Sequence, residues 1–328
     1  MKKNNKPLKI VFFGTPEFAV PSLEALLDSP HEVVGVVTVP DKPAGRGRKL
    51  RPSAVKRAAM THGLPLLQPA RLKDPAFLEQ LRQWDADMFV VVAFRILPRE
   101  VWQMPPKGTF NLHASLLPDY RGAAPINWVI INGESKTGVT TFFIDDKIDT
   151  GEIIAQKEIP VAPDETASSL HDKLMRLGAD LVGETVDRIA AGDLQTVPQR
   201  HIPTLHPAPK LTPQNTRIDW QREGAFLERF IRGLADYPGA WTYLQVKNQP
   251  KKWFIYRARF VPEKHEMPVK TMLLEGKKLK IALKDGWLYP LEVKEEGKKR
   301  MKISDYINGI VNNFSNIRLD AEEIDKKS

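Results

Sequence analysis

The stretch DMFVVVA, residues 87–93, decides the fold. It is an almost continuous apolar run rich in β-branched valine, which suits a strand buried on both faces of a parallel sheet. Two similar runs come before it, at residues 8–13 and 31–39, and the first of them ends at Gly14. A strand that is apolar on both faces needs helices on both sides of its sheet, so this stretch predicts an α/β core.

Helical segments separate these apolar runs along the first two hundred residues. Apolar spacing predicts helices at residues 16–27, 52–62, 75–84 and 166–191. Further strands are predicted at residues 65–67, 108–113, 137–144 and 153–159, the last two as an antiparallel pair. Strands that alternate with helices predict a Rossmann-like, doubly wound and mostly parallel sheet, which we assign to a first domain over residues 1–193.

The composition changes after residue 193. Residues 194–213 contain five prolines, which cannot form one continuous helix and make a poor central strand, so this segment is predicted to be an extended linker. One helix is predicted at residues 224–234. Short strands are predicted at residues 240–246, 254–261, 278–282, 286–293 and 298–303. Short strands separated by turn residues predict a small β-barrel of the oligonucleotide-binding type over residues 214–328.

The net charge of +9 is concentrated in the last third of the chain. Residues 210–328 hold 24 Lys and Arg against 16 Asp and Glu, whereas residues 1–209 hold 25 against 24. A localised positive excess is typical of a protein that binds a polyanion, usually a nucleic acid. A lysine-rich surface that only improves solubility would give the same pattern.

Several functional classes are excluded by residues that the sequence lacks. It has no cysteine, which removes disulfides, thiol catalysis and Cys-ligated metal sites, and it has no HExxH or other His and carboxylate cluster at metal-ligand spacing. It also has no apolar run of about 18 residues, so no membrane span is expected. We therefore expect a cytoplasmic protein with no bound metal.

The first candidate site lies in FNLHASLLPDYRGAAPINW, residues 110–128. Asn111 and His113 are two residues apart, so in a strand their side chains share one face. They stand where the predicted strand ends, and ligands of α/β sheets bind at the carboxyl ends of the strands. A structural histidine with its hydrogen bonds satisfied is the simpler explanation for His113 alone.

A second candidate lies in the turn FIDDKIDTGEII, residues 143–154, which carries Asp145, Asp146 and Asp149. A polar hairpin loop would explain these carboxylates, but one of them could instead support a His113 imidazolium. An amide, an imidazole and a carboxylate suit acyl transfer, because they can stabilise an oxyanion and move a proton. No GxSxG motif and no cysteine nucleophile are present, so the acyl group would pass directly to an amine.

A third candidate is the basic segment DKPAGRGRKLR, residues 41–51, which carries five cations and one carboxylate. It is longer than a usual strand-to-helix loop of about 2–6 residues. Such a segment is either an ordinary solvated loop or a clamp for a phosphate backbone.

The sequence gives little support for a nucleotide cofactor, since neither a GxGxxG motif nor a P-loop occurs.

These segments together resemble the folate-dependent formyltransferase family. The stretch NLHASLLPDYRGAAPINW is similar to the family signature, and IDTG at residues 148–151 is similar to its aspartate loop. DKPAGRGRKL resembles a basic insertion found in the branch of the family that acts on tRNA. Three further segments resemble parts of the C-terminal domain of that branch: RIDW at 217–220, YPGAWT at 237–242 and KKRMKISDYING at 298–309. The resemblance extends over nearly the whole chain.

The resemblance implies that the formyl group of 10-formyltetrahydrofolate moves to the α-amino group of methionine on initiator methionyl-tRNA. It implies catalytic roles for Asn111, His113 and Asp149. It implies that the folate lies against Ser115, Leu116, Leu117 and Pro118. The segment AFRILP at residues 93–98 departs from the family pattern through Arg95, which alters the expected lining of the pterin pocket.

The resemblance also implies how tRNA is held. The basic segment would contact tRNA through Lys42, Arg46, Arg48 and Lys49, and the C-terminal barrel would supply further affinity. We expect the chain to act as a monomer.

Two other functions remain open at the level of sequence. A formyltransferase for a small amine, such as an amino sugar or a purine precursor, would share the Asn, His and Asp set but would not explain the basic segments. A non-catalytic nucleic-acid-binding protein would explain the charge but would leave Asn111, His113 and Asp149 without a role.

Overall fold

The computed structural model describes residues 6–44, 49–200, 205–246, 249–310, 314 and 317–319, and it divides into two compact units. The first unit consists of Met1–Pro125, Lys136–Pro160 and His171–Ala208. The second consists of Ile126–Ser135, Val161–Leu170 and Pro209–Ser328. The second unit therefore takes in two short segments from the first two hundred residues as well as the C-terminal third.

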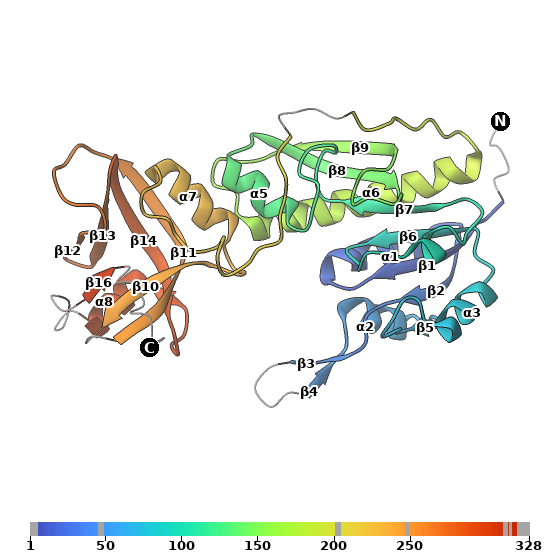
Figure 1. The fold of residues 1–328 in the computed structure, drawn as a ribbon, viewed down its shortest axis with the longest axis horizontal. Helices are drawn as coiled ribbons and strands as arrows, with labels where there is room; N and C mark the ends of the chain where they lie inside the picture. Colours follow the sequence, from blue (N-terminus) through green and yellow to red (C-terminus); the bar gives the residue numbers. More distant parts are fainter. Residues whose placement is uncertain are drawn as a thin grey trace, which may run out of the picture. The chain divides into compact units, whose positions relative to one another are not determined.

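In the described part of the first unit, seven strands form one sheet in the order β5-β2-β1-β6-β7-β8-β9 (Figure 1). Their bounds are β1 Lys9–Gly14, β2 Glu32–Val37, β5 Leu66–Leu67, β6 Met88–Val92, β7 Thr109–His113, β8 Lys136–Phe143 and β9 Ile153–Pro160. Pairing is parallel from β5 to β7, and β8 runs antiparallel to both β7 and β9. The predicted doubly wound, mostly parallel sheet and its late antiparallel pair are confirmed.

Helices cover this sheet, and local side chains define where some of them begin. Their bounds are η1 Glu17–Ala19, α1 Val20–Leu27, α2 Ala54–Thr61, α3 Pro75–Gln83, α4 Arg99–Trp102 and α6 Ala167–Ala191, of which α6 begins in the second unit. The Ser53 hydroxyl accepts a hydrogen bond from Lys56 N at the start of α2, and the Asp74 carboxylate accepts one from Ala76 N at the start of α3. In the described ranges, no helix has the length and apolar character to cross a membrane.

Strand β6, within the apolar run at residues 87–93, lies at the centre of the sheet between β1 and β7, and all five of its residues are buried. Phe89 and Val91 point to one face, where they meet Val11 and Phe13 of β1. Phe77 and Leu81 of α3 belong to the same cluster, so α3 covers this face. Burial on both faces is the reason that this strand is apolar at every position.

The described ends of the predicted basic loop pair as two short strands. β3 Lys42–Ala44 pairs antiparallel with β4 Lys49–Arg51, and Lys42 lies opposite Arg51. At the base of the hairpin, Asp41 accepts hydrogen bonds from Lys56 of α2, at 2.7 Å, and from Gln68, at 2.9 Å. The bonds from Lys56 and Gln68 lower the pKa of Asp41. This anchor fixes the point from which the basic segment leaves the domain.

The second unit holds an antiparallel sheet whose described strands follow the order β12-β13-β14-β11-β10-β16, with β15 beside β14. The bounds are β10 Ala240–Val246, β11 Gln249–Pro262, β12 Met272–Glu275, β13 Lys278–Leu283, β14 Gly286–Glu295, β15 Met301–Lys302 and β16 Ile317–Leu319. The helices of this unit are α5 Pro125–Asn132, α7 Gly224–Gly233 and α8 Ile303–Ile310. The curled sheet confirms the prediction of a small C-terminal β-barrel type of domain.

The strand predicted at residues 298–303 is wrong for most of its length. Only Met301–Lys302 is extended, and α8 begins at Ile303. The buried residues of α8 are Ile303, Tyr306, Ile307 and Ile310, which recur at helical spacing. This spacing outweighs the short alternating pattern that precedes it.

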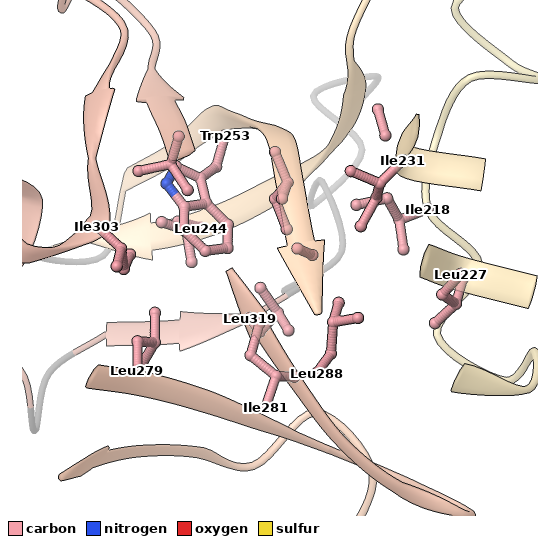
Figure 2. Close-up of a cluster of buried hydrophobic side chains, with 14 of the residues drawn as sticks. Ile218, Leu227, Ile231, Leu244, Trp253, Leu279, Ile281, Leu288, Ile303 and Leu319 are labelled. Atoms are coloured by element: carbon pink, nitrogen blue, oxygen red, sulfur yellow. The ribbon is translucent and has the colours of Figure 1, made fainter. Parts of the chain in front are cut away.

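One apolar cluster holds the second unit together (Figure 2). The indole of Trp253 on β11 is fully buried in it, and α8 contributes Ile303. The remaining labelled members are Ile218, Leu227, Ile231, Leu244, Leu279, Ile281, Leu288 and Leu319. Each fully buried side chain of this kind contributes about 1.5–3 kcal/mol of transfer free energy. Strands and helices of the second unit thus share one core.

A buried carboxylate lies beside this core. Glu295 is 2% exposed, and it accepts hydrogen bonds from Tyr306 Oη at 2.8 Å and Lys298 Nζ at 3.0 Å. Burial alone would raise the pKa of Glu295, but the hydrogen bonds from Lys298 and Tyr306 outweigh it and hold this pKa below its ordinary value of 4.5. A carboxyl whose pKa is lower in the folded state stabilises the fold above its unfolded pKa, and that stabilisation is lost as the pH falls through the folded value.

We expect Glu295→Gln to lower the unfolding free energy at neutral pH by about 1.5–3 kcal/mol, the usual contribution of hydrogen bonds to a charged group. Below pH 4.5 the difference from wild type should shrink, because the carboxyl of the unfolded wild-type chain is then protonated, and the folded carboxyl follows at its lower pKa. Urea unfolding of the full chain at several pH values measures both effects. Glu266→Gln is the matched control, since Glu266 is exposed. An equal loss of stability at all pH values would contradict this account of Glu295.

Candidate active site

Strand β7 carries Asn111 and His113 on one face, as their spacing predicts. His113 is 6% exposed, and Asn111 is half-buried. β7 lies between β6 and β8, where Asn111 pairs with Val91 and His113 pairs with Thr140. The backbone under both side chains is therefore fixed from two sides. In the described chain, the Asn111 amide makes no hydrogen bond, so it is available to a ligand.

The hydrogen bonds of His113 define its tautomer. Its Nε2 atom lies 2.9 Å from the Tyr120 carbonyl oxygen, which can only accept, so Nε2 carries a proton. Its Nδ1 atom lies 3.8 Å from Asp149 Oδ2. The neutral imidazole therefore presents an acceptor at Nδ1, and the imidazolium presents a donor there, in each case facing the carboxylate.

Asp149 reaches His113 because the loop between β8 and β9 folds back over the sheet. β8 ends at Phe143, which pairs with Phe110, and His113 lies three residue steps further along β7 than Phe110. That separation is about 10 Å along a strand, so residues 144–152 must return along the face of β7. The Asp149 side chain is 13% exposed, and Oδ2 accepts a hydrogen bond from Gly122 N at 3.0 Å.

The three aspartates of this loop have different positions. Asp145 accepts hydrogen bonds from Thr150 Oγ1 and Lys147 N, so its carboxylate closes the loop. Asp149 adopts φ +53°, a backbone conformation that is uncommon for residues other than glycine. Such a conformation persists only where surrounding contacts hold it, and it is frequent at active sites. Asp149 is thus the carboxylate that the loop directs toward His113.

The predicted folate-contacting segment forms a preformed wall beyond β7. Ser115 is fully buried, and its hydroxyl donates to the Asp119 carbonyl at 2.7 Å. Leu117 N donates to Thr140 Oγ1, and Leu117 O accepts from Gln156 Nε2. Leu117 is buried, whereas Leu116 and Pro118 are half-buried and offer apolar surface. Thr140 and Gln156 were not singled out in the sequence, and they fix this wall from β8 and β9.

The structure gives roles to Asp119 and Tyr120, which had none in the sequence. Tyr120, at φ +58°, donates its N–H to the His206 carbonyl at 2.8 Å and presents its own carbonyl to His113. Asp119 Oδ1 accepts from His206 N at 2.6 Å, and the rings of Tyr120 and His206 stack. The end of the proline-rich segment is therefore attached to the turn that orients His113.

The predicted tRNA-contacting residues are only partly described. Lys42 is exposed on β3, and Lys49 lies on β4. Arg46 and Arg48 lie outside the described residues. Lys42 and Lys49 thus belong to the two strands of the hairpin, and their proposed contact with tRNA stays a prediction.

Arg95, the departure from the family pattern, is turned toward the backbone of the domain. Its guanidinium donates to the carbonyls of Pro69 at 2.8 Å and Ala70 at 3.1 Å, and it lies over the ring of Phe94. Ala93, which comes just after β6, has φ +47°. The side chain of Arg95 therefore stabilises the end of β6 by joining it to residues 69–70.

Comparison with known families and proteins identifies this arrangement. Residues 8–186 match the model of the formyl transferase family, and residues 210–311 match its C-terminal domain. The methionyl-tRNA formyltransferase of Flavobacterium johnsoniae is 50% identical over 92% of this chain and 96% of its own length. That of Bacteroides fragilis is 48% identical over 94% of this chain and 96% of its own length. The chain belongs to the methionyl-tRNA formyltransferase family. It is an enzyme of formyl transfer.

Solved structures show the same fold. HypX from Aquifex aeolicus, solved in complex with tetrahydrofolic acid, aligns with a TM-score of 0.61 at 19% identity, over 94% of this chain and 48% of HypX. The chain thus spans about half the length of HypX. An N-formyltransferase from Helicobacter canadensis, solved with folinic acid and dTDP-3-aminofucose, aligns with a TM-score of 0.62 at 21% identity, over 86% of this chain and 98% of that protein.

Proposed function

We propose that this chain transfers the formyl group of 10-formyltetrahydrofolate to the α-amino group of methionine on initiator methionyl-tRNA, for the initiation of translation. The observation that carries the proposal is the approach of Asp149 to His113 on the face of β7 that also bears Asn111. The relatives named methionyl-tRNA formyltransferase, 48–50% identical over nearly their whole length, support the choice of acceptor.

The transfer forms a bond between the methionine nitrogen and the formyl carbon, and it breaks the bond between that carbon and N10 of the folate. The amine loses a proton, and N10 gains one. Because the amine attacks the formyl carbon directly, the protein needs no nucleophile of its own. It must instead orient the two substrates, stabilise the negative charge that develops on the formyl oxygen, and move one proton.

We assign these tasks to three side chains. The Asn111 amide has no partner among the described residues, so its N–H groups can donate to the formyl oxygen as charge develops there. The protonated imidazole of His113, held at Nε2 by Tyr120 O, offers Nδ1–H as a second donor. Asp149 stabilises the imidazolium and accepts the amine proton, directly or through water. His113 Nδ1 and Asp149 Oδ2 are 3.8 Å apart, which is longer than a hydrogen bond. Hydrogen bonds between catalytic groups are often long before substrates bind and shorten in the substrate complex.

The residues present fit a folate as the formyl donor. Leu116 and Pro118 offer apolar surface on a wall that Thr140 and Gln156 already hold in place, so little ordering is needed on binding. Ser115 and Leu117 support that wall from inside. The reaction as proposed needs no metal ion, because Asn111 and His113 polarise the formyl carbonyl.

We further propose that the enzyme works as a monomer in the cytoplasm.

The two basic parts of the chain, the segment at residues 41–51 and the C-terminal domain, are proposed to hold the tRNA. Residues 1–193 would carry the chemistry, residues 194–213 would join the domains, and residues 214–328 would supply affinity for the tRNA backbone. The segment of Lys42, Arg46, Arg48 and Lys49 would clamp the tRNA close to the acceptor end. A formyltransferase for a small amine would have no use for either basic region.

We expect Arg46→Ala to weaken methionyl-tRNA binding and to reduce the slope of log affinity against log salt concentration by about 0.7–0.9, the share of one phosphate contact. Folate affinity should stay unchanged. Filter binding at several salt concentrations and folate titration measure the two quantities. Arg82→Ala is the control, since Arg82 is exposed on α3 of the same unit. Equal losses of folate and tRNA affinity would show that the segment had been assigned wrongly.

One assay separates the three candidate functions. Labelled 10-formyltetrahydrofolate is offered with methionyl-tRNA, with a free amino sugar, with a purine precursor amine, or without an acceptor. The proposal predicts rapid labelling of methionyl-tRNA alone. Labelling of a small amine at a comparable rate would favour the second enzyme class, and binding of tRNA with no label transferred would favour a nucleic-acid-binding protein.

A further inference from the structure

The proline-rich segment delivers one side chain to the Asp149 loop. Val197 forms a two-way backbone bridge with Ile153 at the start of β9, with N–H to O distances of 2.9 Å in both directions. Gln199 lies two residues further along the chain, and its side chain reaches the backbone of Asp149 and Gly151. Gln199 is half-buried at this position, next to residues 149–151.

The NH₂ group and the carbonyl oxygen of the Gln199 side chain each make two hydrogen bonds. Its Nε2 donates to the Asp149 carbonyl at 3.0 Å and to the Gly151 carbonyl at 2.8 Å. Its Oε1 accepts from Arg121 Nε at 3.0 Å and from Arg121 Nη2 at 2.6 Å. An amide has two donors and one oxygen, so no other neutral side chain of this length could make the same set of contacts.

These contacts close a ring around Asp149. Arg121 precedes Gly122, whose N–H holds the Asp149 carboxylate, and Gln199 joins Arg121 to the backbone of Asp149 itself. The carboxylate and the peptide of Asp149 are thereby fixed from two directions. Since Asp149 holds φ +53°, which is unfavourable for an aspartate, it needs such external contacts.

We propose that Gln199 is a positioning residue, which holds the Asp149 loop so that the carboxylate faces His113. This inference rests on the role proposed above for Asp149. The competing explanation is that Gln199 only attaches the proline-rich segment to the catalytic domain. In that case its loss would lower stability and leave the chemical step unchanged.

The decisive variant is Gln199→Glu, which keeps the length and shape of the side chain. The introduced carboxylate can still accept from Arg121, but it places negative charge against two carbonyl oxygens in place of two donors. We expect kcat to fall about 10²-fold, the loss typical of a displacement of about 1 Å in a reacting group. The KM values for folate and methionyl-tRNA should stay within about twofold of wild type.

A pH profile separates positioning from attachment. A protonated carboxyl can donate one hydrogen bond, so the activity of Gln199→Glu relative to wild type should recover as the pH is lowered. Gln199→Ala should show the fall in kcat without this recovery. Gln195→Glu is the matched control, because Gln195 is exposed in the same segment and its side chain has no hydrogen bond to any described residue. It should behave as wild type.

The outcomes distinguish this inference from the proposed function. If wild type formylates methionyl-tRNA and Gln199→Glu shows the same kcat and pH profile, the positioning role is wrong. A Gln199→Glu variant that loses thermal stability but keeps kcat would also overturn it, in favour of simple attachment. If wild type transfers no formyl group at all, it is the proposed function that fails.

Discussion

Replacing His113 by alanine is expected to lower kcat for methionyl-tRNA formylation by about 10²–10³-fold, the loss typical of removing one hydrogen-bond donor to a developing oxyanion. The variant removes the group that lies between the Tyr120 carbonyl and the Asp149 carboxylate. No other histidine of the described chain takes part in these contacts. Steady-state rates at saturating folate and methionyl-tRNA measure the effect. Asn111→Ala should likewise lose turnover far more than tRNA affinity.

Two controls keep the His113 prediction specific. Folate and tRNA affinities of His113→Ala should stay close to wild type, because Thr140 and Gln156 hold the segment proposed to contact folate independently of His113. His62→Ala, at an exposed position after α2, should leave kcat unchanged. Near-normal turnover of His113→Ala with intact folding would remove His113 from the reaction.

The second large effect is expected for Gly151→Ala. A Cβ at Gly151 would lie 1.7 Å from the Phe143 carbonyl oxygen, a distance at which backbone atoms must move. Phe143 ends β8, so the clash falls where the Asp149 loop leaves and rejoins the sheet. We expect a loss of about 1–3 kcal/mol in unfolding free energy from overpacking. Displacement of Asp149 should also lower kcat by about 10²-fold or more.

Gly183→Ala is the matched control for Gly151→Ala. Gly183 lies within α6, and nothing is within 4 Å of a Cβ added there. Since alanine is preferred over glycine inside helices by about 1 kcal/mol, this variant should be as stable as wild type or more stable, and fully active. Wild-type kcat in Gly151→Ala would mean that the position of the Asp149 loop does not govern the reaction.

The main features of the fold could be predicted because burial leaves a clear pattern in the sequence. The run at residues 88–92 is apolar throughout because both faces of β6 are buried. The hairpin of β3 and β4 and the short strand β12 could not be predicted, since strands of three or four residues are too short for a period to emerge. The helix α8 was missed because its first residues follow directly on a short extended segment.

Some parts of the candidate site could be predicted from the sequence, and other parts could not. The common face of Asn111 and His113 follows from the period of a strand, and it could be predicted. Spacing could not choose Asp149 over Asp145 or Asp146, and the family resemblance made that choice. The Tyr120 carbonyl and the Gly122 N–H are backbone groups, which do not depend on the side chain, so no side-chain pattern indicates them. Gln199 comes from a distant segment that was predicted only as a linker.

The measurement that tests the central claim most directly is the product formed from methionyl-tRNA and 10-formyltetrahydrofolate by wild type and by Asp149→Asn. Mass spectrometry of the amino acid released from the tRNA locates the added formyl group. The account predicts formylation at the methionine α-nitrogen by wild type and a rate lower by about 10²–10⁴-fold in Asp149→Asn, whose side chain keeps its shape but cannot accept the proton. Equal rates for the two proteins, or methionine that remains unformylated with wild type, would contradict it.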